Sequence, residues 1–250
     1  MVVLNLDLDN TLIYSYKKDT QLEKINVEWY NGRWISYITK KTYELLLSLK
    51  NHMLIVPTST RTESQYKRIN LGTGNIKYAL VCNGGVLLEN GIRNKEWYNK
   101  SQDIIKESIP GLKKAASFLE KDLRRKMEIR FIDGLFIFTK CDRAEEVVQD
   151  LKELLKDSLV YAANNGEKVY VLPYGMDKGM AVKRFREYIN ADMVIAAGDS
   201  SFDIKMLEAA DKKLAPYGFT EKYKINFKPE EAAADMWFSE FILEYCINLL

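Results

Sequence analysis

Histidine is almost absent from this sequence, and cysteine is scarce. His52 is the single histidine of 250 residues, so a Ser-His-Asp mechanism or a histidine-ligated metal site would depend on that one residue. We interpret His52 as a solvated side chain near a helix end. The three cysteines, Cys82, Cys141 and Cys246, are far apart and form no CxxC pair. Such a set is typical of reduced thiols in a cytoplasmic protein and argues against a disulfide framework or a zinc site.

Long apolar runs and an excess of one charge are also missing. No apolar run approaches the roughly 20 residues of a membrane-spanning helix, and the N-terminal MVVLNL lacks the basic start of a secretory signal. The 37 basic residues are balanced by 35 acidic ones, which gives no reason to expect nucleic acid as a partner. With 47% hydrophobic and 29% charged residues, the chain is expected to be a soluble globular protein. We expect a monomer or a small homo-oligomer in the cytoplasm, with no membrane partner.

Short apolar runs alternate with helical patterns along much of the chain. The runs lack polar alternation, as expected for parallel strands covered on both faces, and lie at 2–6, 53–57, 78–82 and 193–197. Helical patterns lie at 40–51, 60–70, 178–190 and 201–210. This alternation predicts an α/β domain with a Rossmann-like parallel sheet.

The middle of the chain has a different pattern. Helical stretches are predicted near 101–122 and 143–156, and each precedes a pair of strands. Asp133-Gly134 joins the first pair and Asn164-Asn165-Gly166 the second, both strong hairpin signals. We therefore predict an α+β insert at 86–173, carried by an α/β domain made of residues 1–85 and 174–250.

A third hairpin is predicted at 25–39, where Asn31-Gly32 lies between β-forming residues. It follows the acids of LNLDLDNTLI closely enough to project over them, although a plain surface hairpin is an equal alternative. Its aromatic residues, Trp29, Tyr30 and Trp34, either stack on a substrate or form the hairpin's own core.

Polar clusters follow the predicted parallel strands. They are Asp7-Leu8-Asp9-Asn10-Thr11, Thr58-Ser59-Thr60-Arg61 and Gly198-Asp199-Ser200-Ser201-Phe202-Asp203, and Lys178-Gly179 opens the helix before the last strand. Ligands of open α/β sheets bind beyond the carboxyl ends of the strands, so we expect these clusters to meet at one rim. Carboxylates without histidine or cysteine suit a hard cation such as Mg²⁺, and a lysine with a hydroxyl suits a phosphate. Together with a carboxylate nucleophile they indicate an aspartyl-phosphate mechanism.

The motifs DLDNT (7–11), TSTR (58–61), Lys178 and GDSSFD (198–203), in this order, resemble the haloacid dehalogenase (HAD) superfamily. YALVCNGGVLL (78–88) and MDKGMAVKRF (176–185) further resemble its Cof-type branch, subfamily IIB. That branch carries a C2-type cap and includes sucrose-phosphate and mannosyl-3-phosphoglycerate phosphatases. The resemblance implies a HAD fold with an α+β C2-type cap that sets substrate specificity.

The resemblance also implies roles for individual residues. Asp7 would be the nucleophile, and Asp9 would protonate the leaving group and then activate water. Period-two geometry would put both side chains on one side of an extended chain. Mg²⁺ would be held by Asp7, the Asp9 carbonyl and Asp199, with Asp203 in support, and Lys178 would neutralise the phosphate and the nucleophile.

The motif at 58–61 leaves its phosphate-binding hydroxyl open. The branch usually has Thr-Gly-Arg there; alignment on Arg61 selects Ser59, which we prefer, and alignment on the strand end selects Thr58. Phe202 also departs from the usual Asn of the last motif, a change that affects packing more than metal binding.

Simpler interpretations exist for several of these residues. Asp7 and Asp9 would then be solvated turn acids, Lys178 a surface lysine, Asp203 a helix N-terminal acid, and Thr58 or Ser59 a helix cap. The basic run at 124–126 is interpreted as a solvated face rather than an anion site.

The sequence therefore predicts a Mg²⁺-dependent phosphatase acting on a small phosphorylated metabolite, with a sugar phosphate as one candidate. A phosphomutase on the same core is the nearest alternative. A catalytically silent protein that binds a phosphorylated metabolite is the alternative from another class, because fold alone does not determine function.

Overall fold

The computed structural model describes all residues, 1–250, and the chain forms two compact units. The core unit consists of Met1–Asn94 and Lys178–Leu250, and the inserted unit of Lys95–Asp177. The sequence pattern places the insert at 86–173. Residues 86–93 contribute strands that pair within the core unit instead.

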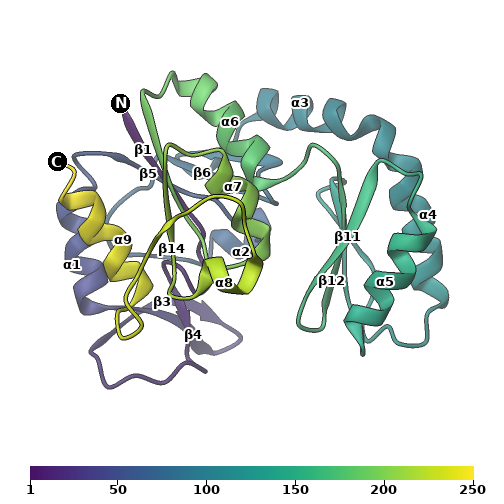
Figure 1. Cartoon of the computed structure of the whole chain (residues 1–250), viewed down its shortest axis with the longest axis horizontal. Coiled ribbons are helices and arrows are strands. Elements are labelled where there is room, and N and C mark those ends of the chain that lie inside the picture. The colour runs from purple at the N-terminus through teal and green to yellow at the C-terminus, as the bar shows by residue number, and fades with distance from the viewer. The chain divides into compact units, whose positions relative to one another are not determined.

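A five-stranded parallel sheet forms the centre of the core unit (Figure 1). Its order is β15 (Glu230–Glu231), β14 (Lys212–Ala215), β13 (Met193–Ala197), β1 (Val2–Leu6) and β5 (Leu54–Pro57). The predicted strands at 2–6, 53–57 and 193–197 are confirmed as members of this sheet, and every pairing in it is parallel. The predicted α/β class with a parallel core is thus confirmed.

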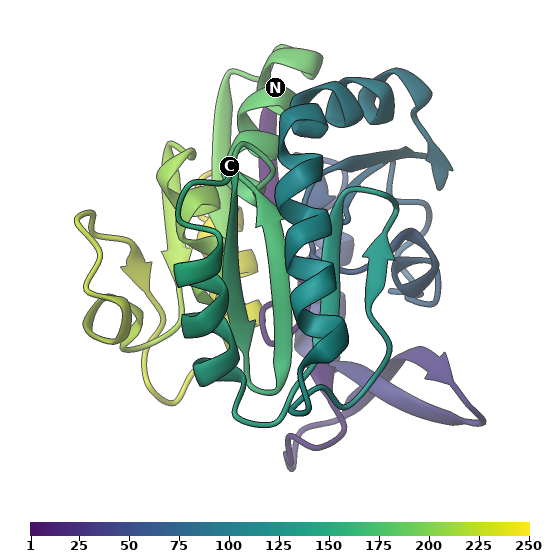
Figure 2. The same ribbon diagram turned by 90° about the vertical axis from the view of Figure 1, so that its right-hand side faces the viewer.

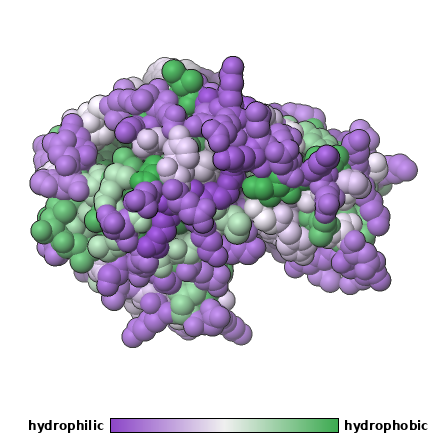
Figure 3. All heavy atoms as spheres, turned by 90° about the horizontal axis from the view of Figure 1, so that it is seen from above, coloured by the Kyte–Doolittle hydropathy of each residue, from purple (hydrophilic) through white to green (hydrophobic).

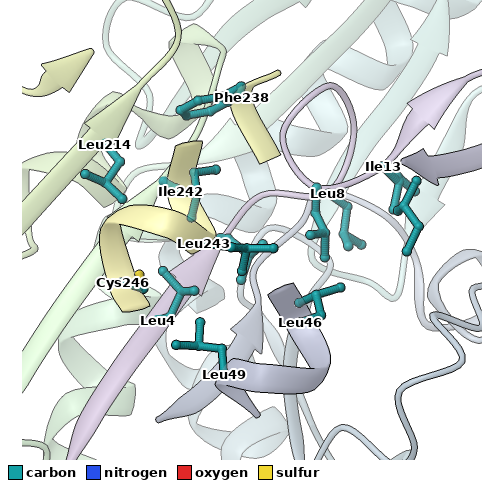
Figure 4. Packing of buried hydrophobic residues seen from close by; sticks show 14 of the residues in the cluster. Leu4, Leu8, Ile13, Leu46, Leu49, Leu214, Phe238, Ile242, Leu243 and Cys246 are labelled. Carbon is teal, nitrogen blue, oxygen red and sulfur yellow. The ribbon is translucent and has the colours of Figure 1, made fainter. Parts of the chain in front are cut away.

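Alternate residues of β1 serve the two faces of the sheet. Leu4 and Leu6 point into a cluster with α1 (Lys40–Leu49) and α9 (Phe238–Ile247), as Figure 4 shows for Leu4. In that view Leu243 of α9 lies between Leu4 and Leu46 of α1. Burial of each such side chain contributes about 1.5–3 kcal/mol. Helices α6 (Lys178–Ile189) and α7 (Ile204–Glu208) lie on the other face (Figure 1).

The prediction for 78–82 is only partly right. β6 (Tyr78–Val81) is a strand, but it pairs antiparallel with β7 (Val86–Glu89), which pairs with β8 (Ile92–Arg93). Its link to the parallel sheet is a single parallel bridge between Thr58 and Leu80. The turn after β6, with left-handed backbone at Cys82 and Asn83, sends the chain straight back, so β6 heads a small meander rather than the parallel sheet.

The hairpin predicted at 25–39 is confirmed. β3 (Lys24–Tyr30) and β4 (Arg33–Thr39) pair antiparallel, with β2 (Tyr14–Ser15) on the far side of β4. Asn31 and Gly32 both have positive φ, as a two-residue type I′ turn requires.

Several predicted helices differ from the observed ones. The pattern at 60–70 yields only α2 (Glu63–Tyr66), because Ile69 pairs with Glu28 and the Asn70 N–H donates to the Val27 carbonyl, both in the hairpin. The pattern at 201–210 becomes a 3₁₀ turn (Ser201–Asp203) followed by α7. The short α8 (Phe219–Tyr223) and the C-terminal α9 were not predicted.

The inserted unit is a four-stranded antiparallel sheet with helices on one face (Figure 2). Its sheet order is β11 (Val160–Asn165), β12 (Lys168–Pro173), β10 (Phe136–Lys140) and β9 (Arg130–Ile132). The helices on this face are α4 (Ile109–Lys121) and α5 (Ala144–Leu154). α3 (Lys95–Ile105) precedes α4 and is joined to it by a 3₁₀ turn (Lys106–Ser108). The pattern near 101–122 thus covers two helices. Both predicted hairpins are confirmed.

The surface seen in Figure 3 is mostly hydrophilic, in keeping with a composition that is 29% charged. All three cysteines are buried free thiols, and His52 is exposed just after α1. None of the helices combines the length and the apolar character that crossing a bilayer requires.

Candidate active site

The carboxyl ends of three neighbouring strands lie at one level. Leu6, the last residue of β1, is in register with Pro57 of β5 and with Ala197 of β13. Beyond these ends the Asp7 N–H donates to the Ala197 carbonyl (2.9 Å), and the Thr58 N–H donates to the Leu6 carbonyl (2.8 Å). The three polar clusters therefore begin side by side, as predicted.

Asp7 and Lys178 form a buried ion pair. Lys178 Nζ lies 2.5 Å from Oδ1 of Asp7 and 2.5 Å from Oδ1 of Asp203. Lys178 is 1% exposed, and Asp203 is fully buried. A buried ammonium between two carboxylates is stable only because a charged partner replaces the water that each group loses on burial. Lys178 is therefore not a surface lysine, and Asp7 is not a solvated turn acid.

Gly198 allows Asp203 to fold back over the loop that follows β13. A Cβ at Gly198 would lie 2.3 Å from Cβ of Asp203, which no side chain tolerates. With that space open, Oδ2 of Asp203 accepts hydrogen bonds from the N–H groups of Asp199 (3.1 Å) and Ser200 (2.9 Å). One carboxylate thus orders the loop and binds Lys178, and the capping interpretation of Asp203 holds together with its place in the site.

Gly179 brings the helix that carries Lys178 close to α7. A Cβ at this position would lie 2.4 Å from the carbonyl oxygen of Lys205 in α7. Only glycine permits this approach of α6 to the α7 backbone, which places Lys178 next to Asp203. In the dipeptide Lys178-Gly179, the glycine allows the close helix contact that positions the lysine ammonium.

Three carboxylates gather around this lysine. Asp7, Asp199 and Asp203 each offer an oxygen, and these oxygens lie within 4.8 Å of one another. Burial and repulsion from Asp203 raise the pKa of Asp199 to about 7. Burial also raises the pKa of Asp7, although Lys178 opposes the shift. Burial alone would lower the pKa of Lys178, but Asp203 and Asp7 hold it above its ordinary value.

This donor set fits a hard divalent cation. Oxygen ligands without nitrogen or sulfur are those that Mg²⁺ prefers, and a cation would relieve the repulsion among the acids. Lys178 supplies one positive charge to three acids, so a further cation is electrostatically favourable here. Asp203 already bonds to Lys178 and to the loop, which suits a supporting position rather than a direct ligand.

The chain is not extended from Asp7 to Asp9, so the period-two argument for these two acids is wrong. β1 ends at Leu6, and the Leu8 carbonyl accepts from the N–H groups of Leu12 and Ile13 in a tight turn. Within this turn the Asp9 side chain is 53% exposed, and it pairs with Arg61 rather than with Lys178.

Thr58 and Ser59 differ in what their hydroxyls do. The Thr58 hydroxyl donates to the Val56 carbonyl (3.2 Å) and accepts from Asn5 Nδ2 (3.0 Å), so both of its functions are used inside the core unit. The Ser59 hydroxyl accepts from the Arg61 N–H (3.2 Å) and keeps its own proton available. Ser59 is therefore the better donor to a phosphoryl oxygen.

Sequence reasoning missed the group that holds Asp9. Arg61 donates to both oxygens of Asp9, from Nε (2.8 Å) and from Nη2 (2.7 Å). Its remaining nitrogen, Nη1, donates to Oε1 of Glu28 at 2.8 Å. In the sequence, Arg61 served only to align the motif at 58–61, and nothing indicated that it binds Asp9. A single glutamate in the 25–39 hairpin carries no spacing signal that would pair it with residue 61.

A second missed network supports Asp199. The Thr11 hydroxyl donates to Oδ1 of Asp199 at 3.2 Å, and the Tyr14 hydroxyl lies 3.3 Å from the Thr11 carbonyl and 3.3 Å from Ser239 Oγ. Ser239 opens the α9 segment, so the C-terminal helix reaches the acid cluster through buried hydroxyls. Such contacts are invisible in sequence because residues 11 and 239 are far apart in the chain.

Neither the basic run at 124–126 nor the aromatic cluster of the 25–39 hairpin forms a charged binding site. Arg124 pairs with Asp122 and Asp150, and Lys126 pairs with Asp142 and Glu167. Arg125 donates to the carbonyls of Leu119 and Met127. These bonds satisfy the basic run locally, in line with the solvated-face interpretation. In the hairpin, Trp29, Tyr30 and Trp34 are about half exposed, and the two indoles meet edge to face at 5.1 Å.

Comparison with known proteins agrees with this geometry. A family model described as haloacid dehalogenase-like hydrolase matches residues 30–215. None of the curated protein sequences matches this chain.

Solved structures share the fold over nearly the whole chain. The sucrose-phosphatase of Synechocystis sp. PCC6803, in complex with sucrose and phosphate, is 16% identical with a TM-score of 0.67, and the match covers 99% of this chain and 97% of that one. A sugar phosphatase of HAD subclass IIB is 16% identical with a TM-score of 0.64, covering 99% and 100%. The HAD phosphatase BT1666 of Bacteroides thetaiotaomicron is 18% identical with a TM-score of 0.61, covering 98% and 94%. At these identities the likeness shows the fold.

Proposed function

Because this chain belongs to the haloacid dehalogenase-like hydrolases, we propose that it is a phosphatase that cleaves a small phosphorylated metabolite through a phosphoryl group carried on Asp7. The observation that supports this most directly is the buried cluster of Asp7, Lys178, Asp199 and Asp203 at the strand ends. A buried carboxylate held beside an ammonium and two further acids has no evident purpose in a stable core, where such burial is costly.

In the first step an oxygen of Asp7 attacks phosphorus, and the bond from phosphorus to the leaving oxygen breaks. Asp9, protonated on an oxygen that has been released from Arg61, donates this proton to the leaving oxygen, so the leaving group departs as an alcohol. In the second step Asp9 takes a proton from water, the water oxygen attacks phosphorus, and the bond to Asp7 breaks. Phosphate is released and both acids return to their starting state.

Positioning and charge stabilisation supply most of the catalysis. Lys178 favours the ionised form of Asp7 against the effect of burial, and it lies close enough to neutralise the transferred phosphoryl group. Ser59 donates to a phosphoryl oxygen. Mg²⁺, held by Asp7, Asp199 and the Asp9 carbonyl with support from Asp203, would neutralise charge on the phosphoryl oxygens.

The two units divide the work in this proposal. The core unit, Met1–Asn94 with Lys178–Leu250, is the catalytic core, since it contains every residue of the cluster. The inserted unit, Lys95–Asp177, is the cap that selects the substrate. A sugar phosphate is the favoured class, because similar folds belong to a sucrose-phosphatase and a subclass IIB sugar phosphatase. Three buried free thiols fit a cytoplasmic location.

Phosphate release from p-nitrophenyl phosphate tests the activity. We expect turnover that requires Mg²⁺, is abolished by EDTA, and is absent in Asp7→Asn. Full activity in Asp7→Asn would show that another group is the nucleophile. Lys183→Met, an exposed lysine on α6, is the matched control and keeps wild-type activity.

A panel of phosphorylated metabolites separates the alternatives. Free phosphate identifies a phosphatase, whereas an isomerised sugar phosphate without free phosphate identifies a phosphomutase. Tight binding without any turnover across the panel identifies a silent binding protein and contradicts the proposal.

A further inference from the structure

Glu28 is a buried acid outside the cluster that carries the proposed chemistry. It is fully buried, and it accepts hydrogen bonds from Ser36 Oγ (2.8 Å), Arg61 Nη1 (2.8 Å) and Arg68 Nε (3.1 Å). Burial raises its pKa, but the bonds from Arg61, Ser36 and Arg68 outweigh that effect and hold the pKa below its ordinary value. Glu28 is therefore a fixed negative charge in the hairpin.

An irregularity in strand β3 turns the Glu28 side chain toward the interior. Val27 and Glu28 are consecutive and both buried, although neighbouring residues of a strand ordinarily face opposite sides. The pairing of β3 with β4 shifts register on both sides of Glu28, between Asn26 and Glu28 and between Glu28 and Trp29. Such a bulge re-aims a side chain, and here it turns Glu28 inward. A bridge between Glu28 and Ile69 holds the strand from its other side.

Arg61 connects this fixed charge to the rim. Its Nε and Nη2 bind the two oxygens of Asp9, and its Nη1 binds Glu28. A guanidinium is a rigid plane, so two carboxylates on different edges define its orientation. Arg61 is 13% exposed, whereas Asp9 is 53% exposed. Asp9 is therefore the most exposed of the three groups, and it is oriented from the buried end.

We propose that Glu28 is a positioning residue, which orients Asp9 at the rim through the guanidinium of Arg61. The inference rests on the proposed function, in which Asp9 delivers a proton to the leaving group. It also gives the 25–39 hairpin a defined role, since the strand that carries Glu28 becomes part of the support of the site. At the tip of the hairpin, the Tyr30 ring packs against the Arg68 guanidinium, which also donates to Glu28.

Leaving-group dependence distinguishes positioning from a purely structural contribution. p-Nitrophenol leaves as a stable anion and needs little protonation, whereas glycerol leaves only with a proton. General acid catalysis contributes on the order of 10²- to 10⁴-fold, so partial misorientation of Asp9 costs a part of that factor. In Glu28→Gln we expect kcat/KM for glycerol phosphate to fall about tenfold or more and that for p-nitrophenyl phosphate less than about threefold. Loss of structure alone would lower both by the same factor.

The matched control is Glu63→Gln. Glu63 also pairs with an arginine, Arg93, and with Lys67 in the core unit, but it has no bond to Arg61 or Asp9. This variant keeps the wild-type ratio between the two substrates. If Glu28→Gln does not fold, Arg61→Lys takes its place, because lysine keeps the charge but lacks the planar fork. The same change in ratio supports the inference, and an unchanged ratio contradicts it.

The failure of this inference and that of the proposed function are distinguishable. If the wild-type protein hydrolyses both substrates and the variants lower both equally, Glu28 is structural and the phosphatase proposal stands. If the wild-type protein releases phosphate from neither substrate or from any other phosphate ester, both proposals are wrong.

Discussion

At the scale of single residues, the two hydroxyls after β5 have separate tasks. Thr58 bonds to Asn5 and Val56 within the core unit, whereas Ser59 keeps a free donor. The sequence left the choice between them open, since alignment on Arg61 favours Ser59 and alignment on the strand end favours Thr58. Hydrogen-bond partners from β1 and β5 favour Ser59, and those partners depend on how the strands pair.

Substitution of each hydroxyl should therefore affect a different property. Thr58→Val removes the partner of buried Asn5, whose Oδ1 already lacks one, and should lower the free energy of unfolding by about 1–3 kcal/mol. Ser59→Ala should leave that free energy nearly unchanged and lower kcat/KM for phosphate release by about tenfold or more. Urea unfolding and steady-state kinetics on both variants measure this. A large loss of kcat/KM in Thr58→Val with little loss in Ser59→Ala would show instead that Thr58 is the phosphate-binding hydroxyl.

The raised pKa of Asp199, about 7 against 3.8 for a free carboxyl, predicts a pH-dependent response to Mg²⁺. Between these values the folded metal-free protein binds more protons than the unfolded chain, so its stability falls as the pH rises from about 4 to 7. Mg²⁺ must displace the proton, so its stabilising effect should be small at about pH 5.5 and larger at about pH 8.

Thermal unfolding in EDTA and in excess Mg²⁺ at the two pH values measures this difference. Asp199→Asn is the control, since it removes both the proton and a metal ligand and should show little response to Mg²⁺ at either pH. An equal rise in Tm at both pH values in the wild-type protein would show that Asp199 does not control metal binding.

At the scale of elements, apolar runs predicted strands well where the strand lies inside the parallel sheet and is covered by helices. VVLNL and MVIAA occupy β1 and β13 with the predicted bounds, since both are covered by helices on each face. YALVC has the same composition, yet β6 turns back at residues 82–85 into a meander. Periodicity reports burial rather than the direction of the partner strand, so this difference was not available from the sequence.

The contact between α6 and α7 carries a prediction at this scale. Gly179→Ala would place a methyl group 2.4 Å from the Lys205 carbonyl, a backbone atom that cannot move alone. Separation of the helices should lower the free energy of unfolding by about 1–3 kcal/mol and displace Lys178 from Asp7, with a loss of activity. Unfolding and phosphate release are measured together.

Gly111→Ala is the matched control for this substitution. Its Cβ would lie 2.9 Å from Cγ2 of Val160, a side-chain methyl group that can shift. Gly111 lies in α4 of the inserted unit, away from the acid cluster, so activity should remain. Equal loss of activity in both variants would show that helix packing in general, rather than the position of Lys178, limits catalysis.

At the scale of the whole molecule, the order of motifs and the alternation of patterns were enough to predict an α/β core interrupted by an α+β insert. The site was predictable to the extent that its residues follow strand ends, as Asp7, Ser59 and Asp199 do. Glu28 and Ser239 reach the same region from a hairpin and from the last helix, and only tertiary packing brings them there. Residues of this kind support a site without belonging to any motif.

The inserted unit should fold without the rest of the chain. Its core joins α4 and α5 to the sheet through buried residues that all lie within Lys95–Asp177, among them Leu112, Val147 and Val171. A helix-covered antiparallel sheet of this size can bury enough apolar surface to be stable alone. We expect residues 95–177, expressed separately, to unfold cooperatively on heating and to show no phosphatase activity, since the acid cluster lies entirely in the core unit. Circular dichroism and phosphate release test this, and a chain that is unfolded in isolation would mean that the core unit is required to hold the insert in shape.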